Sequence, residues 1–356
     1  MPPIKRSARI TLSAVAADAG VALSTASVIL SENQEYLRNF SPSTILRVRK
    51  SAQRLGYRAN LFASGLPGKG SSLFFMLAVP ALDPGTPGAH YSWGLHGDLM
   101  GGVAETAHEA GVFPIVVLFK PQPGGADSQS FDRVLHGGAF GAIVCSPPAP
   151  LEKILRQRIK ESQPIVVVFP ERVSEWSSNV VDIDNVALGE QAGQLFARQR
   201  RRKWLIILDE ENEEAHALRL RGFQKVAREC RARVERLPCP HEVSADEASV
   251  RVAPWLAKFR PDAVFALASR TAQGFLHACK RVGVEAGTEV LLVGCDCSIW
   301  QTPLLPRITS LEASWRQVGE TAMQQLGRMR DDGGSRFGSI LLPPTLVPGD
   351  TCPPAN

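Results

Sequence analysis

The sequence predicts a small all-α head at the N-terminus and, behind it, an α/β body of two lobes in which helices flank parallel sheets. Three observations lead to this prediction. First, 356 residues are too many for one compact core. Second, residues 1–58 contain three short helical patterns and an excess of basic side chains. Third, from about residue 71 onwards, apolar runs of strand length alternate with longer amphipathic stretches.

Positive charge is concentrated in the head. Residues 1–70 hold ten Lys and Arg against three Asp and Glu, a net charge of +7, whereas the remaining residues carry a net charge of −2. Such an asymmetry suits a module that neutralises phosphates, so the head is a candidate DNA-binding unit. Charge alone leaves open a basic tail that only aids solubility.

The sequence has no export or membrane signal. Residues 1–20 lack the apolar stretch of a signal peptide, and no later stretch offers the roughly eighteen uninterrupted apolar residues that a membrane span needs. We therefore expect a cytoplasmic location. The seven cysteines are odd in number and scattered, which argues for reduced thiols rather than a disulfide framework.

Metal, cofactor and enzyme chemistry also lack a signal. Cys295 and Cys297 have no second cysteine pair or histidine cluster to complete a zinc tetrahedron. The glycines of segment 65–71 lack the spacing of a P-loop, and no G-x-G-x-x-G pattern follows a strand into a helix. No H-E-x-x-H or G-x-S-x-G pattern is present. We expect no metal, no cofactor and no enzymatic activity.

The first two helical patterns of the head form a candidate helix-turn-helix. The first begins behind Thr11, a suitable N-cap, and ends at Gly20. From Val21 a tight turn leads to the second, which turns small polar side chains outward, as a recognition helix in a DNA major groove requires. The inward side chains are Leu12, Val15, Ala16 and Ala19 in the first helix and Ala26, Ile29 and Leu30 in the second, while Ser24, Thr25 and Ser27 face outward.

A third helix is predicted from Ser41 as N-cap and Pro42 at the first helical position, ending at Gly56. Basic side chains on or beside it suit contacts with the DNA backbone. Short amphipathic helices also occur in many bundles, so this pattern alone is not specific. The apolar stripe is Ile45, Val48, Ala52 and Leu55, and the basic residues are Arg47, Arg49, Lys50, Arg54 and Arg58.

The order of residues in these helices resembles the head of the lactose-repressor (LacI/GalR) family. Ala63 and Leu66 also fall where the family's hinge helix carries alanine and leucine. The matching residues are Ile10-Thr11-Leu12-(x)2-Val15-Ala16-(x)2-Ala19-Gly20-Val21-(x)3-Thr25-(x)-Ser27, then Ser41-Pro42-(x)-Thr44-(x)2-Arg47-Val48 and Leu55-Gly56-Tyr57-Arg58-(x)-Asn60.

This resemblance implies a homodimer whose two heads read the half-sites of a near-palindromic DNA operator. Residues 59–70 would be the hinge or linker, and Leu66 would be a wedge in the minor groove. The alternative for Leu66 is a linker residue that touches the body. The DNA contacts implied by the resemblance are Thr11, Leu23, Ser24, Thr25, Ser27, Arg47, Tyr57, Asn60, Ala63 and Leu66.

The head also departs from the family pattern. Val28 stands where the family usually has a base-reading arginine, and segment 31–40 between the second and third helices is longer than typical. Pro67 removes an N–H and favours extended backbone at Leu66. For Tyr36, Arg38 and Phe40 we prefer packing on the helix pair to DNA contact. These departures bear on the operator sequence and on the hinge.

The body alternates strands and helices in two sets, which predicts two lobes with parallel sheets. Ligands of such folds bind beyond the carboxyl ends of the strands. Strands are expected at 73–79, 113–119, 142–145 and 165–169, then at 204–208, 263–267 and 290–293, with helices near 94–110, 127–136, 150–161, 186–200, 215–230, 246–258 and 271–282.

The family resemblance extends to the body and implies a periplasmic-binding-protein-like pair of lobes that close on an effector. Local matches are Arg219-(x)2-Gly222-Phe223, Val293-Gly294-(x)-Asp296 and Val181-(x)-Ile183-Asp184-Asn185. The effector-binding and dimerisation domain is assigned to 71–342, with lobe 1 at about 71–173 plus 300–325, lobe 2 at about 174–299 plus 326–342, and a C-terminal tail at 343–356.

The expected effector is a small molecule, a sugar or a sugar acid. Many sugar-binding members have an Asn-Asp pair where this chain has Ser269-Arg270, so an acidic ligand is expected if Arg270 faces the cleft beside Arg219. Alternatively, Arg270 points to solvent. Tyr91 and Trp93, in the loop after the first strand of the body, are candidates for stacking on a ligand. The expected effector-binding residues are Tyr91, Trp93, Glu171, Arg219, Arg270 and Asp296.

The predicted function is therefore a sequence-specific DNA-binding transcriptional regulator, a repressor whose operator affinity is controlled by the effector. Two alternatives stay open at this point. A small-molecule binding receptor would explain the body but normally needs an export signal. An α/β enzyme with a helical appendage would need a catalytic constellation.

Overall fold

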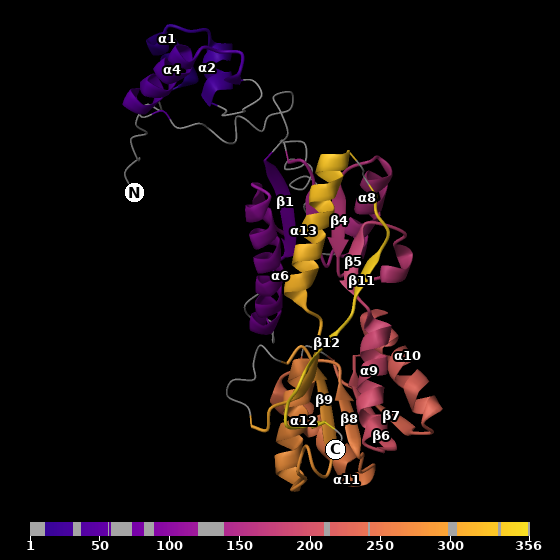
Figure 1. Cartoon of the computed structure of the whole chain (residues 1–356). Helices are drawn as coiled ribbons and strands as arrows, with labels where there is room; N and C mark the ends of the chain where they lie inside the picture. Colours follow the sequence, from indigo (N-terminus) through magenta and orange to yellow (C-terminus); the bar gives the residue numbers. More distant parts are fainter. Residues whose placement is uncertain are drawn as a thin grey trace. The chain divides into compact units, whose positions relative to one another are not determined.

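The computed structural model describes residues 11–30, 37–55, 57, 73–81, 89–119, 139–209, 214–240, 243–297, 305–333 and 336–354 (Figure 1). For residues 89–93, 149 and 150 it describes the backbone alone. The chain forms two compact units, Met1–Ser71 and Ser72–Asn356. We call the first unit the head and the second the body.

The head contains the three predicted helices, α1 (Leu12–Ala19), α2 (Leu23–Leu30) and α4 (Pro42–Leu55). The Thr11 hydroxyl accepts the Ala14 N–H at 3.3 Å, and Gly20 ends α1 in the left-handed conformation with φ 62°, so both predicted boundaries are confirmed. Buried apolar side chains from all three helices meet in one core. They are Val15, Ala16, Ala19, Ala26, Ile29, Leu37, Val48 and Ala52.

Helices α1 and α2 are bent by 106° relative to each other, within the roughly 90–120° typical of a helix-turn-helix. Within the described part of the chain, no single helix is both long and apolar enough to cross a membrane. Only α1 and α2 taken together reach the required length and composition, and that sharp bend separates them.

Lobe 1 of the body is a six-stranded sheet in the order β11-β5-β4-β3-β1-β2, with every pairing parallel. Continuous apolar runs form its inner strands because helices cover both faces. The strands are β1 (Phe74–Pro80), β2 (Phe113–Phe119), β3 (Ala142–Cys145), β4 (Ile165–Val168), β5 (Val180–Ile183) and β11 (Ile340–Leu342); the helices are α6 (Ala89–Glu109), α8 (Ala149–Lys160) and α13 (Trp315–Asp332).

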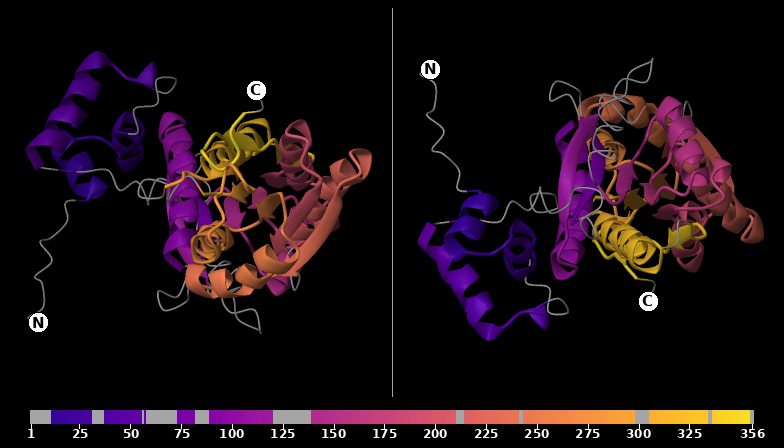
Figure 2. Two further views of the ribbon diagram at one scale, coloured as in Figure 1. Left: turned by 90° about the horizontal axis from the view of Figure 1, so that it is seen from below. Right: turned by 90° about the horizontal axis from the view of Figure 1, so that it is seen from above.

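Lobe 2 is also a six-stranded sheet, in the order β12-β10-β9-β8-β6-β7, and all its pairings are parallel except that of β12 with β10. Figure 2 shows the two lobes of the body, with helices around their sheets, from two further directions. Along β6, Leu205 and Ile207 join the core that includes side chains of α11 and α12, whereas Trp204 and Ile206 join the other core. The strands are β6 (Lys203–Leu208), β7 (Arg233–Pro238), β8 (Ala263–Ala266), β9 (Leu291–Cys295), β10 (Thr309–Glu312) and β12 (Thr345–Val347); the helices are α9 (Asn185–Arg198), α10 (Glu214–Glu229), α11 (Ala245–Lys258) and α12 (Ser269–Val282).

The predicted lobe boundaries are wrong in the last sixty or so residues and at β5. Strand β5 belongs to lobe 1, β10 to lobe 2 and β11 to lobe 1, where α13 also packs. Strands of three or four residues carry too little pattern to reveal their partners, which lie far away in the sequence. The predicted helix at 127–136 lies outside the described residues.

The predicted C-terminal tail is also wrong, because this segment is built into lobe 2. Strand β12 pairs antiparallel with β10. Further on, Thr351 is fully buried, and its hydroxyl donates to the Leu292 carbonyl at 2.8 Å. Cys352 is buried as well.

Within the described residues the chain passes between the lobes three times, after β5, between β10 and α13, and between β11 and β12. These crossings are hydrogen-bonded to one another. The Asp184 N–H donates to the Leu342 carbonyl at 2.8 Å, and the hydroxyls of Ser314 and Thr345 are 2.9 Å apart. The crossings therefore form one connected hinge region.

In each lobe, glycines bring the backbones of neighbouring helices into contact. A Cβ at Gly189 of α9 would lie 1.9 Å from the Arg219 carbonyl oxygen of α10, and a Cβ at Gly222 would lie 2.0 Å from the Val186 oxygen. In lobe 1, Gly102 of α6 and Gly319 of α13 meet the opposing helix at 2.1 and 2.2 Å in the same way. Only glycine permits this approach.

We predict that Gly189→Ala destabilises the body by about 1–3 kcal/mol, because its methyl group must displace a backbone carbonyl. The matched control is Gly327→Ala in α13, where a new Cβ meets nothing within 4 Å. That variant should gain up to about 1 kcal/mol from helix propensity. Scanning calorimetry of both variants checks this, and equal melting temperatures would contradict the close-contact interpretation.

Candidate functional site

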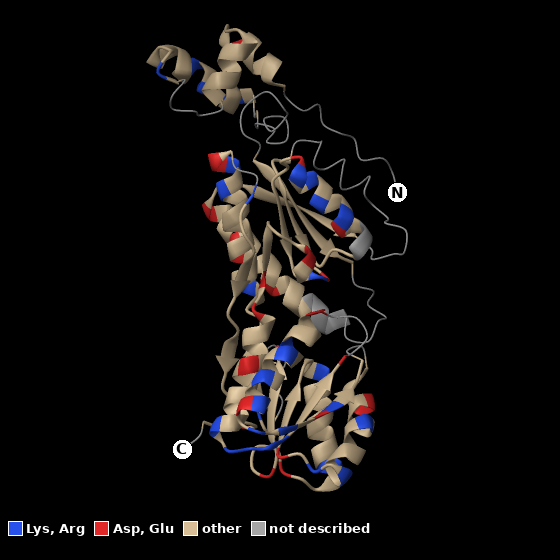
Figure 3. Ribbon diagram, turned by 90° about the vertical axis from the view of Figure 1, so that its right-hand side faces the viewer, with Lys and Arg blue, Asp and Glu red and all other residues tan. Residues whose placement is uncertain are grey.

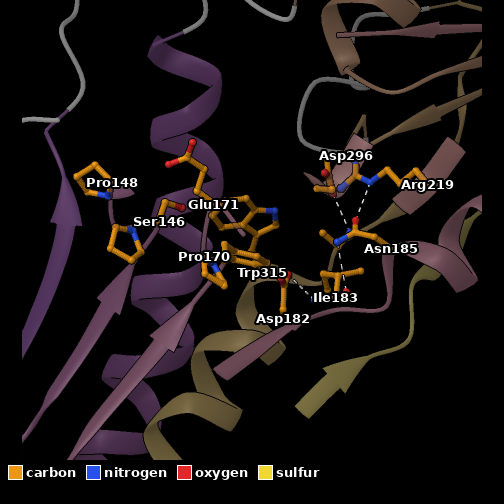
Figure 4. A pocket seen from close by; sticks show the side chains of 14 residues that line it. Ser146, Pro148, Pro170, Glu171, Asp182, Ile183, Asn185, Arg219, Asp296 and Trp315 are labelled. Atoms are coloured by element: carbon orange, nitrogen blue, oxygen red, sulfur yellow. Dashed lines mark hydrogen bonds between the residues drawn. The ribbon is translucent and has the colours of Figure 1, made fainter. Parts of the chain in front are cut away.

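A cavity of about 360 Å³ lies between the two lobes of the body, at the carboxyl ends of their strands (Figure 4). This is the position that the α/β pattern predicts for a ligand. Its size lies within the roughly 300–1,000 Å³ usual for small-molecule sites. The lining residues are Ser146, Pro147, Pro148, Phe169, Pro170, Glu171, Asp182, Ile183, Asn185, Ala215, Arg219, Asp296, Ala313 and Trp315.

Three lining residues directly follow a strand and have left-handed backbone. Ser146 follows β3 with φ 44°, Phe169 follows β4 with φ 50°, and Asp296 follows β9 with φ 50°. Non-glycine residues in this conformation store strain, and they concentrate at functional sites. The backbone therefore turns sharply where these strands reach the cavity.

Arg219 is held in a fixed direction by a neighbouring helix. Its Nε donates to Oδ1 of Asn185 at 2.8 Å, and its Nη1 donates to the Leu267 carbonyl at 3.4 Å. Asn185 is buried at the start of α9, and its Nδ2 donates to the Ile183 carbonyl at 3.3 Å. The Asn185 amide thus links Arg219 to the crossing that follows β5.

Two carboxyl groups of the lining are buried. Burial raises the pKa of Asp182 to about 7, with Arg219 acting against the shift and Glu214 adding to it. Burial likewise raises the pKa of Asp296 to about 6, against the opposing charge of Arg219. Both groups are held in place by the backbone, because Asp182 accepts the Ile183 N–H at 2.7 Å and Asp296 accepts the Ala313 N–H at 2.8 Å.

The opposite wall of the cavity is apolar. The rings of Phe169 and Trp315 lie with their centroids 4.2 Å apart, and His96 packs behind the indole at 5.4 Å. Three prolines extend this surface: Pro147, Pro148 and Pro170. An aromatic face opposite fixed polar groups suits a ligand with one apolar face.

Three of the six predicted effector residues come together here, because Glu171, Arg219 and Asp296 all line the cavity. Arg270 lies in the first turn of α12 and is not among the lining residues. Tyr91 and Trp93 belong to the first turns of α6, so the prediction that they lie in a loop is wrong. Their side chains lie outside what the structure describes.

Sequence reasoning missed several lining residues. Ser146 directly follows the strand predicted at 142–145, and Phe169 is the last residue of the strand predicted at 165–169, so both positions could have been found. Asn185 was part of a quoted family match but was given no role. Asp182 had one signal, a carboxylate within an apolar strand, and Trp315 had none, since β10 before it was not predicted.

In the head, α2 presents the predicted recognition surface. Leu23 is 53% exposed, Ser24 is exposed, and Thr25 and Ser27 are half-buried. Arg47 is exposed on α4. The remaining predicted contacts differ in kind: Thr11 caps α1, Tyr57 packs against the head core, and Asn60, Ala63 and Leu66 lie outside the described residues.

The described part of the head is strongly basic (Figure 3). Its one acidic residue, Asp18, accepts hydrogen bonds from Ser51 and Arg54 and so ties α1 to α4. Arg54 is therefore a structural residue as well as a cation. The other basic residues of the described head are Arg38, Arg47, Arg49 and Lys50.

The chain is similar to known proteins along almost its whole length. A periplasmic binding protein-like domain model matches residues 193–352. Catabolite control protein A of Staphylococcus epidermidis is 21% identical over 334 residues, which cover 94% of this chain and 96% of the relative. Catabolite control protein A of Priestia megaterium is 23% identical over 327 residues, covering 89% and 91%.

Solved structures share the fold of head and body. The lac repressor dimer bound to operator and the anti-inducer ONPF has a TM-score of 0.79 at 19% identity, covering 97% of this chain and 100% of that chain. The transcriptional regulator CelR in complex with cellobiose has a TM-score of 0.64 at 20% identity, covering 96% and 100%. Over almost its whole length the chain is therefore similar to catabolite control protein A, and its helix-turn-helix head and two-lobed body have the fold of the lac repressor.

Proposed function

We propose that this protein is a homodimeric repressor that binds a near-palindromic operator through its heads and is controlled by a small molecule in the cavity of its body. The observation that carries the proposal is the presence, in one chain, of a basic helix-turn-helix and of a cavity lined by both lobes. A receptor would not need the head. The cytoplasmic location expected from the sequence is part of this proposal.

The surface of the head supports DNA binding. Helix α2 offers small polar side chains at Ser24, Thr25 and Ser27, which can reach base edges in a major groove. Arg47 on α4 is exposed, as a phosphate contact must be. We therefore propose that α2 contacts base edges and that α4 contacts the phosphates of the DNA backbone.

The position of the cavity supports control by a ligand. Asp182, Ile183 and Asn185 flank the first crossing between the lobes, and Ala313 and Trp315 flank the second. A ligand that touches these segments gains a different number of contacts when the lobes change their angle. Such a difference in affinity is what shifts a conformational equilibrium.

An exposed apolar edge supports the homodimer. Strand β2 lies at one edge of the lobe 1 sheet, and Phe113, Val116 and Leu118 on it are 43%, 45% and 50% exposed. An edge strand with exposed large apolar side chains is a liability in a monomer, so proteins cover or pair such edges. A second copy of the chain is the proposed cover. The lac repressor structure to which this chain is similar is a dimer.

The test of the function is selection of bound duplexes from a random DNA pool by the full chain. We expect enrichment of a two-fold symmetric site. Ser24→Ala or Thr25→Ala should change the enriched bases, because these side chains face the groove. Arg47→Ala should instead weaken binding to all sequences and lower the salt slope by about 1.

Equal losses on every sequence from both sets of variants would contradict the assignment of α2 as the recognition helix. Enrichment of no motif by the unmodified chain, with or without candidate effectors, would count against the function itself.

A separate prediction concerns the dimer. Val116→Asp should convert the protein to monomers at micromolar concentration, because a buried carboxylate would then face its copy across the interface. Leu341→Asp is the matched control: Leu341 is 49% exposed on β11, at the opposite edge of the same sheet. Sedimentation velocity measures both, and a dimeric Val116→Asp variant would place the interface elsewhere.

A further inference from the structure

The charge of the cavity sets limits on its ligand. Glu171, Asp182 and Asp296 line it with carboxyl groups, and Arg219 is the one cation among the described lining residues. Arg219 is already engaged, since its Nε is bonded to Asn185. An anionic ligand would meet three acidic groups for one guanidinium, and this opposes the acidic effector expected from the sequence.

Asp182 is the most deeply buried of these carboxyl groups. Its side chain is 5% exposed and points into the cavity (Figure 4). Only Oδ1 accepts a hydrogen bond from the described residues, from the neighbouring Ile183 N–H at 2.7 Å, and Oδ2 accepts none from them. Burying a carboxylate with so few donors is costly. A binding site keeps such a group when a ligand supplies the missing donor.

Nearby charges reinforce this need. Glu214, at the start of α10, is close enough to Asp182 to help raise its pKa. Its Oε2 accepts the Ser174 N–H from lobe 1 at 3.1 Å, so it faces the same gap between the lobes. In the same way, the charge of Glu312 helps to raise the pKa of Asp296.

Other arginines near the cavity are paired outside it. Arg156 binds Glu152 and Glu175 at 3.3 and 3.1 Å. Arg172 also binds Glu175, and Arg316 binds Glu105 at 2.6 Å. None of the carboxylates in these ion pairs lines the cavity.

We propose that the cavity binds a small hydroxylated cation, a protonated amine with several hydroxyl groups such as a hexosamine, with its ammonium group against Asp182. This assignment rests on the proposed effector function of the cavity. The ammonium supplies the donors that Oδ2 of Asp182 lacks. Arg219 and Asp296 are placed to bind hydroxyl groups, and Trp315 offers an aromatic face that attracts a cation or a ring with C–H groups.

The experiment compares matched ligands by calorimetry and thermal shift on the full chain. The cationic set is D-glucosamine, D-galactosamine and D-mannosamine. The parent hexoses form the neutral set, their N-acetyl derivatives remove the charge but keep the nitrogen, and the uronic acids form the anionic set. We expect one amine to bind about tenfold or more tightly than its neutral and acidic counterparts, as a charge-assisted hydrogen bond implies.

Tighter binding of a neutral or acidic member would overturn the proposal, and so would the absence of binding in every set. Neither result decides the repressor function, because that function is tested by whether the full chain enriches a DNA site, not by which member of this panel it binds. Enrichment of a symmetric DNA site together with tighter binding of neutral sugars would support the repressor function and contradict the proposal of a cationic ligand.

Asp182→Asn separates a binding role from a structural one. We expect it to reduce the preference for the amine over the neutral hexose at least tenfold. It should also raise the melting temperature of the unliganded protein by roughly 2–4 °C at pH 8. The pKa of Asp182 in the folded protein lies above its ordinary value, so ionisation of this carboxyl lowers the stability of the unsubstituted protein as pH rises from about 4 to 7 and above. The gain in melting temperature from Asp182→Asn should therefore vanish near pH 4.

Glu161→Gln is the control, because Glu161 is an exposed carboxylate of lobe 1 outside the cavity. It should change neither ligand preference nor melting temperature. A loss of stability in Asp182→Asn at pH 8, with ligand preference unchanged, would make Asp182 a structural residue and overturn the assignment.

Discussion

The close contact between α9 and α10 is the constraint on which the site depends. Gly189 and Gly222 let each helix rest on a carbonyl of the other, and this brings Asn185 at the start of α9 within 2.8 Å of Arg219 on α10. A side chain at either glycine would separate the two helices and with them the pair. Backbone packing of the two helices therefore sets the position of the Arg219 guanidinium, and the hydrogen bond to Asn185 fixes its direction.

The site is stable in spite of its polar groups, not because of them. Asp182 and Asp296 are buried with pKa values raised by desolvation, and Ser146 and Phe169 hold strained backbone beside them. Apolar cores on both faces of each sheet provide the compensating stability. Binding sites are commonly built at such a cost, because a group fully satisfied by its own chain has nothing left to offer a ligand.

How much could be predicted depended on whether structure was fixed locally. Strands 113–119 and 142–145 were predicted to the residue, since each is an apolar run bounded by breakers. Strands β10, β11 and β12 were missed because three or four residues acquire their conformation only from a distant partner. The same holds for the cavity. Glu171 and Asp296 could be predicted because they lie near the ends of predicted strands, whereas Trp315 lies after β10, a strand without a local sequence pattern.

The cavity and the hinge region share the same segments of this body. Asp182 and Asn185 bracket the crossing after β5, and Trp315 follows the crossing after β10, which Asp296 holds through the Ala313 N–H. A hydrogen-bonded link joins the second crossing to the third through Ser314 and Thr345. The energy of ligand contacts therefore depends directly on the backbone that sets the angle between the lobes. Coupling between effector and lobe movement then requires no chain of intermediate residues, only a difference in contacts at the hinge itself.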